Sequence, residues 1–264
     1  MAGPVELRPT IDRGWLEAAA ARDPVDHAYA LWDLDRFPGT ARFVSAVRGD
    51  VTIGYLLVWH GLPATPIVHW HGTAPGAEAL LRELPPRPAV VIAPVEARDG
   101  VLRARGPGRE FPELVMLRPA DGPFPSPGPA ASVRPLAGSD LAELAAWASR
   151  ETHPETSEYP SLDPGADPVW GAFDGGRLVG VARPAVRLPR VWVIAGVYVE
   201  PGARRRGLAR GLVGSIVAAA ARAGAATGLY VREDRPEARR LYEGLGFRAT
   251  GRRLWLDLGA DLAP

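Results

Sequence analysis

The chain has 264 residues, a length that allows one large domain or two modest domains, each with a buried core. Hydrophobic residues make up 47% and charged residues 23%, as in an ordinary globular protein, and a formal net charge of +1 argues against nucleic acid as the main partner. The absence of cysteine excludes disulfides, a cysteine-linked acyl-enzyme and thiolate metal sites.

Targeting signals are not evident in the sequence. No apolar run reaches the ~20 residues that a membrane helix needs. The first ten residues lack the basic start and apolar core of a secretory signal. We therefore expect a cytoplasmic protein with no membrane partner.

The first half alternates short predicted strands and helices. Asp23-Pro24 separates two helical patterns, and Gly49-Asp50 closes an alternating hairpin. The expected strands are residues 6–9, 41–47, 51–59, 67–70, 89–93, 101–104 and 111–117, and the expected helices are residues 12–22, 25–34 and 77–84.

A proline-rich segment, residues 119–131, divides the chain and predicts an extended connector. We expect one domain over residues 1–118 and a second over residues 132–264. In the second domain the expected strands are residues 132–135, 169–173, 178–187, 191–199, 228–231, 246–247 and 254–256. The expected helices are residues 139–149, a helix that begins at Leu208 and has apolar residues as far as Ala220, and residues 234–244.

One stretch joins a buried strand to an amphipathic helix through a basic turn. Residues 191–199 are rich in β-branched and aromatic side chains, and helical apolar spacing begins at Leu208. The first amides of a helix lack partners inside it, and the helix macrodipole favours an anion there. Residues 204–207 add three arginines and a glycine, so the turn predicts a diphosphate site, with an ordinary solvated turn as the alternative.

The spacing Arg204-x-x-Gly207-x-Ala209 resembles the acyl-CoA-binding signature Gln/Arg-x-x-Gly-x-Gly/Ala of the GCN5-related N-acetyltransferase (GNAT) family. Further along, residues 229–247 resemble the family block Asn-x-x-Ala-x-x-x-Tyr-x-x-x-Gly-Phe, with Arg235 in place of the asparagine. The two motifs stand in the family order, and the likeness is strong over residues 132–258.

The resemblance implies an α/β (α+β) fold of tandem GNAT-like units, each a mixed, mostly antiparallel sheet flanked by helices. It implies an N-acyltransferase, in the first place an N-acetyltransferase, that moves an acyl group from acetyl-CoA directly to a primary amine of a small molecule or peptide. Tyr242 then protonates the leaving thiolate, with packing beside Ala238 as the alternative role. The implied acyl-CoA contacts are Val197, Tyr198, Val199, Arg204, Arg205, Arg206, Gly207, Leu208, Ala209, Arg210, Asp234 and Arg235.

The polar, proline-broken segment 150–167 is long for a connecting loop. In GNAT proteins the matching region lies over the acceptor site, so the resemblance implies amine binding by this loop, with a solvated loop as the alternative. Residues 191–199 contain no Asp, Glu or His, so the general base is a loop residue, a water chain or the amine's own equilibrium. The implied acceptor contacts are Glu151, His153, Glu155, Glu158 and Tyr159.

The first half has the GNAT order of elements without the arginine–glycine turn. Pro75 stands where basic donors are needed, so we expect a degenerate half, similar to the glycine N-acyltransferase and FR47-like branch. His69 and His71 share one face of a strand, but no third ligand lies nearby in sequence and we expect no metal. A non-catalytic acyl-CoA-binding regulator is the alternative function, and the sequence leaves both monomer and homodimer open.

Overall fold

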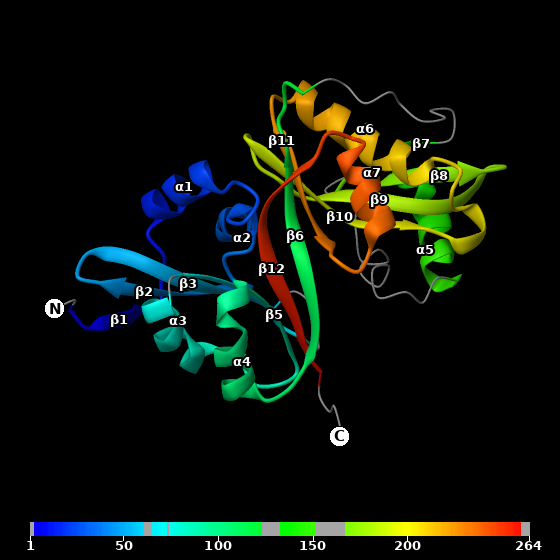
Figure 1. Ribbon diagram of the computed structural model, residues 1–264. Coiled ribbons are helices and arrows are strands. Elements are labelled where there is room, and N and C mark those ends of the chain that lie inside the picture. The colour runs from blue at the N-terminus through cyan, green and yellow to red at the C-terminus, as the bar shows by residue number, and fades with distance from the viewer. Residues whose placement is uncertain (1–2, 61–64, 73, 123–132, 151–166, 260–264) are drawn as a thin grey trace. The chain divides into compact units, whose positions relative to one another are not determined.

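The computed structural model describes residues 3–60, 65–72, 74–122, 133–150 and 167–259 (Figure 1). The chain forms two compact units that are not simple halves of the sequence. Unit 1 comprises Met1–Val115, Val231–Pro236 and Thr250–Pro264, and unit 2 comprises Met116–Tyr230 and Glu237–Ala249.

Unit 1 is a mostly antiparallel sheet with helices on both faces. Its strands are β1 (Val5–Arg8), β2 (Ala41–Arg48), β3 (Val51–Trp59), β4 (Ile67–Gly72), β5 (Ala89–Ala93), β6 (Arg109–Arg118) and β12 (Arg248–Leu258), and its helices are α1 (Arg13–Arg22), α2 (Ala28–Arg36), α3 (Ala74–Leu80) and α4 (Arg98–Arg105). The strand order is β1-β2-β3-β4-β5-β12-β6, and β4 and β5 run parallel.

Side chains of this sheet alternate between its faces, as strand geometry requires. Leu56 and Val58 of β3 pack in the same cluster as Val101 of α4, whereas Leu57 packs in the cluster that holds Leu16 of α1. Helices α3 and α4 therefore cover one face of the unit 1 sheet, and α1 and α2 cover the other (Figure 1).

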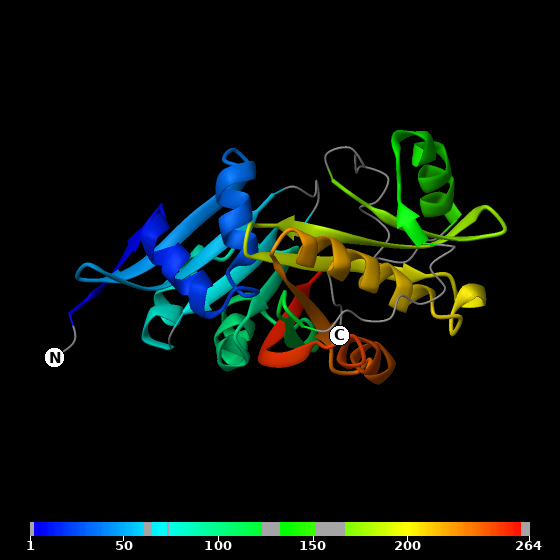
Figure 2. The same cartoon turned by 90° about the horizontal axis from the view of Figure 1, so that it is seen from above.

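Unit 2 repeats this plan. Its elements are β7 (Val133–Pro135), α5 (Leu141–Arg150), β8 (Trp170–Asp174), β9 (Arg177–Arg187), β10 (Val191–Val199), α6 (Leu208–Arg222), β11 (Ala226–Arg232) and α7 (Pro236–Glu243). The strand order is β7-β8-β9-β10-β11, with β10 and β11 parallel and the other neighbours antiparallel. Figure 2 shows α5 and α6 on opposite faces of this sheet, so β9 and β10 are covered on both sides.

The two units confirm the predicted fold class, and most predicted elements lie within a few residues of the observed ones. The strand expected at residues 101–104 was wrong, because these residues lie in α4. Only Val101 of this helix is buried, and the helix ends at Gly106, whose φ is 81°. A run of four residues is too short to distinguish the helical period from the strand period.

The two units differ from the expected division, because unit 1 also contains Val231–Pro236 and the end of the chain from Thr250, and unit 2 begins at Met116. Leu254–Leu258 of β12 pair with β5, so the end of the chain belongs to unit 1. The expected connector, residues 119–131, lies largely outside the described residues, and its role as the domain boundary stays a prediction.

Unit 1 buries a cluster of polar and aromatic side chains beside the start of α2. His27 Nδ1 lies 2.8 Å from the Tyr55 hydroxyl, and the ring of His71 stacks on Tyr55 with centroids 4.8 Å apart. Arg253 of β12 donates to both carboxylate oxygens of Asp26, at 3.1 and 2.6 Å, and its Nη2 lies 2.9 Å from His71 Nδ1. The cluster therefore links α2, β3, β4 and β12 through polar contacts.

His69 extends this cluster by stacking on Tyr29 of α2, with ring centroids 4.8 Å apart. Burial lowers the pKa of His69 and of His27 to about 4. Burial likewise holds the pKa of His71 well below its ordinary value. All three imidazoles are therefore neutral at physiological pH.

We predict that His69→Phe removes part of the acid sensitivity of unit 1, because phenylalanine keeps the stacking on Tyr29 but binds no proton. The folded-state pKa of His69 is depressed to about 4 from 6.5, so its stabilising contribution is present above pH 6.5 and lost as the pH falls toward 4. The free energy of unfolding of the wild type should fall relative to the variant by up to about 3 kcal/mol over this window, measured by urea unfolding at both ends.

Other buried groups do not disturb this comparison. Burial raises the pKa of Asp33 and of Glu113 to about 7, which gives these carboxyls the opposite pH dependence. Both are present in wild type and variant, so their contributions cancel in the difference. A difference that is independent of pH would contradict a buried, neutral His69.

Candidate functional site

The turn between β10 and α6 has two residues in the left-handed backbone region. Arg205 has a φ of 59°, the one positive value for a non-glycine residue in the described part of the chain, and Gly207 has a φ of 80°. An L-residue in this region costs roughly 1–2 kcal/mol, so surrounding contacts must stabilise the turn.

Gly207 is also the N-cap of α6 and provides no side-chain hydrogen bond to the helix. The Gly211 amide donates to the Gly207 carbonyl oxygen at 2.9 Å, which closes the first turn of the helix. The amides of Leu208, Ala209 and Arg210 precede this bond and have no acceptor inside the helix. The start of α6 thus offers amide donors and the positive end of the helix dipole to an anion.

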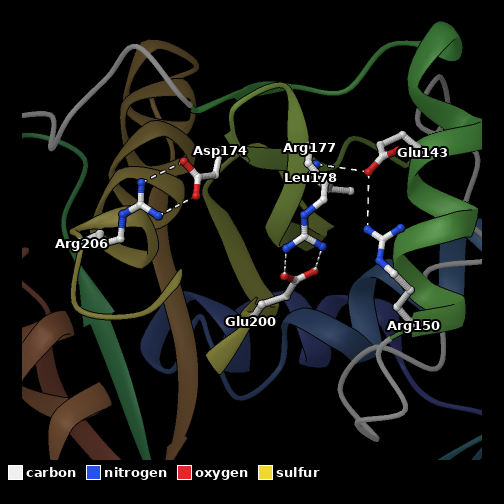
Figure 3. A network of polar contacts seen from close by, with 7 residues as sticks. All are labelled: Glu143, Arg150, Asp174, Arg177, Leu178, Glu200 and Arg206. Carbon is white, nitrogen blue, oxygen red and sulfur yellow. Dashed lines mark hydrogen bonds and ion pairs between the residues drawn. The ribbon is translucent and has the colours of Figure 1, made fainter. Parts of the chain in front are cut away.

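The arginines of the turn are held by different partners. Arg204 Nε donates to the Val199 carbonyl oxygen at 2.9 Å, and its guanidinium lies 5.6 Å from the centre of the Tyr198 ring. Arg206 makes two hydrogen bonds to Asp174, at 2.6 and 2.9 Å (Figure 3). The sequence assigned the arginines of this turn to a diphosphate, whereas the structure shows two of them bonded to protein groups.

Strand β10 has a bulge just before the turn. Its pairing with β9 shifts register between Ala195 and Tyr198, and Gly196 has a φ of 61°. The parallel register with β11 covers Val191–Ile194 in the described residues. Tyr198 is 7% exposed and its ring packs 5.9 Å from that of Trp147, so its contact with a ligand at β10 would come from the backbone.

Arg210 connects the first turn of α6 to the end of α7. Its Nη2 donates to the Gly244 carbonyl oxygen at 3.1 Å. Tyr242 lies in the last turn of α7, is 8% exposed, and contacts Phe247 edge to face with ring centroids 6.0 Å apart. Within unit 2 the structure therefore links the basic turn to the helix that carries the predicted acid.

The remaining predicted acyl-CoA contacts precede α7. Asp234 makes two hydrogen bonds with Arg232, one of them 3.0 Å long, and lies 3.8 Å from Arg235 Nε. Arg232 also lies 3.8 Å from the centre of the Phe111 ring. Asp234 and Arg235 are exposed, so both remain accessible to a ligand.

A group of polar side chains around the β8–β9 turn was not predicted from the sequence (Figure 3). Arg177 makes two hydrogen bonds to Glu200, one of 3.1 Å and one shorter, and Asp174 holds Arg206. Glu143 of α5 accepts a hydrogen bond from the Leu178 amide at 3.2 Å. Asp174 and Arg177 flank Gly175-Gly176 in the sequence, which indicates a turn. Their partners lie more than 20 residues further along the chain, so local sequence patterns could not identify them.

Several predicted residues give no structural result. The predicted acceptor contacts lie in residues 151–166, outside the described residues, and they are Glu151, His153, Glu155, Glu158 and Tyr159. The described residues contain no group of three or more His, Asp or Glu side chains that could hold a metal. Within the same residues, no helix combines the length and apolar character that crossing a bilayer requires.

A model of the acetyltransferase (GNAT) family matches residues 139–247. A crystal structure of a GNAT-family acetyltransferase from Novosphingobium aromaticivorans, described as putative, is similar to 92% of this chain and 94% of its own, with 25% identity and a TM-score of 0.55. A GCN5-related N-acetyltransferase from Sphaerobacter thermophilus is similar over 98% and 99% of the two chains, with 19% identity and a TM-score of 0.64.

A tandem GNAT protein from the clavulanic acid biosynthesis pathway is similar to 98% of this chain and 100% of its own, with 13% identity and a TM-score of 0.60. The comparison with curated proteins gave no significant match. The family match includes the basic turn and α7, and the solved structures span both units. Residues 139–247 therefore match the GNAT family, and the chain has the fold of tandem GNAT proteins.

Proposed function

We propose that this protein is an N-acyltransferase that moves an acyl group, in the first place acetyl, from acyl-CoA to a primary amine of a small molecule or peptide. The match of residues 139–247 to the GNAT family supports acyl-CoA-dependent transfer in general. The observation that carries the proposal is the turn that opens α6, with left-handed Gly207 and no side-chain cap. A diphosphate fits this arrangement because its oxygens accept from amides and its charge matches the helix dipole.

Binding of the cosubstrate involves β10 and the residues before α7. We assign the diphosphate to the amides of Leu208, Ala209 and Arg210 and to Arg205, which is exposed and lies between Arg204 and Arg206. The backbone of residues 197–199 is proposed to pair with the pantetheine arm as an added strand does. We propose that Asp234 or Arg235 takes the place of the family's asparagine contact, and that Arg204 and Arg206 contribute mainly by shaping the turn.

Acyl transfer requires a neutral amine, a polarised thioester carbonyl and a proton for the departing thiolate. The amine nitrogen bonds to the carbonyl carbon, the carbon–sulfur bond breaks, and the nitrogen loses a proton. The chain has no cysteine for an acyl-enzyme, so we propose direct transfer in a ternary complex. Acyl-CoA supplies the activated acyl group for this step.

Tyr242 is proposed to protonate the thiolate, because a phenol with a pKa near 10 carries its proton at neutral pH. Residues 191–199 contain no Asp, Glu or His to accept the proton of the amine, and the carboxylate of Glu200 that follows is bonded to Arg177. We therefore assign deprotonation to the segment 151–166, to a water chain or to the amine's own neutral fraction.

The main alternative is an acyl-CoA-binding regulator without catalysis, which the lack of Asp, Glu and His on β10 suggests but the comparisons do not favour. The two functions are distinguished by thiol release from acetyl-CoA with a panel of amino acids, aminoglycosides, polyamines and peptides. The protein has no cysteine, so every thiol detected is released CoA. Calorimetric binding of CoA without thiol release across the panel would support the regulator.

We predict that Gly207→Glu weakens acetyl-CoA binding. The substitution places an L-residue at a φ of 80° and a carboxylate at the helix end proposed to hold the diphosphate. We expect the Kd for acetyl-CoA, measured by calorimetry, to rise about tenfold or more.

Gly224→Glu is the matched control for this substitution. Gly224 follows the other end of α6, has a φ of +74°, and has no atom within 4 Å of an added Cβ. It therefore introduces the same charge and similar backbone strain away from the basic turn. Equal losses of affinity in the two variants would contradict a diphosphate site at Gly207.

We predict that Tyr242→Phe lowers kcat about 10²- to 10⁴-fold while the Kd for acetyl-CoA stays nearly unchanged, because the proton donor is lost and the ring packing on Phe247 is kept. Steady-state thiol release and calorimetry check the two parts. Tyr29→Phe in unit 1, which keeps the stacking on His69, should retain full activity. Unchanged turnover in Tyr242→Phe would remove this residue from the mechanism.

A further inference from the structure

We infer that the β8–β9 turn holds the acyl-CoA diphosphate site in shape through two ion pairs, Asp174–Arg206 and Arg177–Glu200, which makes Asp174 and Arg177 positioning residues. The inference rests on the proposed function, because it concerns the site assigned there to the diphosphate. This inference gives a structural role to Arg206, whose guanidinium is bonded to Asp174.

The two ion pairs attach the β8–β9 turn to both ends of the basic turn (Figure 3). Glu200 follows directly after β10, and Arg206 lies two residues before α6 begins. The pairs have opposite polarity, because the β8–β9 turn contributes the acid to one and the base to the other. Exchanging the partners would place Asp174 against Glu200 and Arg177 against Arg206, so the charges favour the observed pairing.

The β8–β9 turn is itself fixed by neighbouring elements. The Leu178 amide donates to Glu143 of α5 at 3.2 Å, and the Glu200 amide donates to the Val179 carbonyl oxygen at 2.9 Å. Hydrogen bonds therefore connect α5 to β9, and β9 to Glu200 at the end of β10. Asp174 and Arg177 extend this connection to the basic turn.

The strained residue lies between anchored neighbours. Arg205 is left-handed, with a φ of 59°, while Arg204 is bonded to Val199 and Arg206 to Asp174. Anchoring both neighbours favours the left-handed conformation that local sequence disfavours. Loss of the Asp174 anchor should let the turn relax and move the amides that follow it.

The two pairs differ in exposure and therefore in their expected effects. The side chains of Arg206 and Asp174 are 52% and 46% exposed, so this pair adds little to overall stability and acts on local shape. The side chain of Glu200 is 10% exposed, so removing Arg177 leaves a poorly solvated carboxylate without this partner.

The test measures binding of CoA, dephospho-CoA and S-acetylpantetheine to wild type, Asp174→Asn and the charge swap Asp174→Arg with Arg206→Asp. CoA and dephospho-CoA contain the diphosphate, whereas S-acetylpantetheine lacks it. We expect Asp174→Asn to raise the Kd for the first two ligands about three- to fivefold and to leave the third unchanged. The swap should restore the Kd to within about twofold of wild type, because it restores the pair.

The variant Arg177→Gln tests the second pair, with an expected rise of about tenfold in the Kd for CoA. Asp35→Asn is the matched control, because it breaks an Arg–Asp fork with similar exposure, 47% and 59%, in unit 1. Its Kd values should equal those of wild type.

Three results would overturn the inference. An unchanged Kd in Asp174→Asn would show that the pair does not shape the site. A lower Kd in Asp174→Asn would show that Asp174 competes with the ligand for Arg206. Failure of the swap to restore binding would indicate direct contact of Arg206 with the diphosphate. Absence of CoA binding by wild type, in contrast, would refute the proposed function itself.

Discussion

The structure of unit 2 depends on the passage from β10 into α6. In this passage the chain leaves a strand covered on both faces and enters a helix with eight buried residues. The diphosphate site proposed here also needs the first amides of the helix uncovered, which disfavours a capping side chain at residue 207. Left-handed Gly207 meets this requirement, and left-handed Arg205 is held by the bonds of its two neighbours. The acyl-CoA site proposed here is thus a consequence of backbone geometry.

Unit 1 has a parallel strand pair like that of unit 2 but lacks the basic turn. Its parallel pair β4–β5 spans residues 67–69 and 90–92, as β10–β11 spans 191–194 and 226–229 in unit 2. Helix α3 after β4 has seven residues and includes Pro75, which has no amide hydrogen to donate. The face of β4 toward α2 is filled by buried, neutral His69 and His71. His69 stacks on Tyr29, and His71 stacks on Tyr55 and contacts Arg253, so these histidines contribute to the packing of unit 1.

The sequence allowed prediction of the parts that depend on local pattern. The hairpin of β2 and β3, the strand β10 and the start of α6 at Leu208 follow from side-chain periodicity and glycine placement, and they were predicted within a residue. Helix α4 was mistaken for a strand because its apolar run is short. The pairing of β12 with β5 could not be predicted, because a strand's own pattern does not identify its partner. The same limit applies to the pairs of Asp174 and Arg177.

The electrostatics of the chain explain why the shape of the turn matters more than its arginine count. The protein has 31 basic and 30 acidic residues, and all of the basic ones are arginine. Arginine forms two-bond forks with carboxylates, as Arg206 does with Asp174, and such a fork neutralises much of the charge offered to a ligand. A near-neutral protein attracts an anionic cosubstrate only weakly at long range. We therefore propose that affinity for a diphosphate comes from short-range contacts with the amides and with Arg205. In this proposal the ion pairs of the turn matter mainly because they orient these groups.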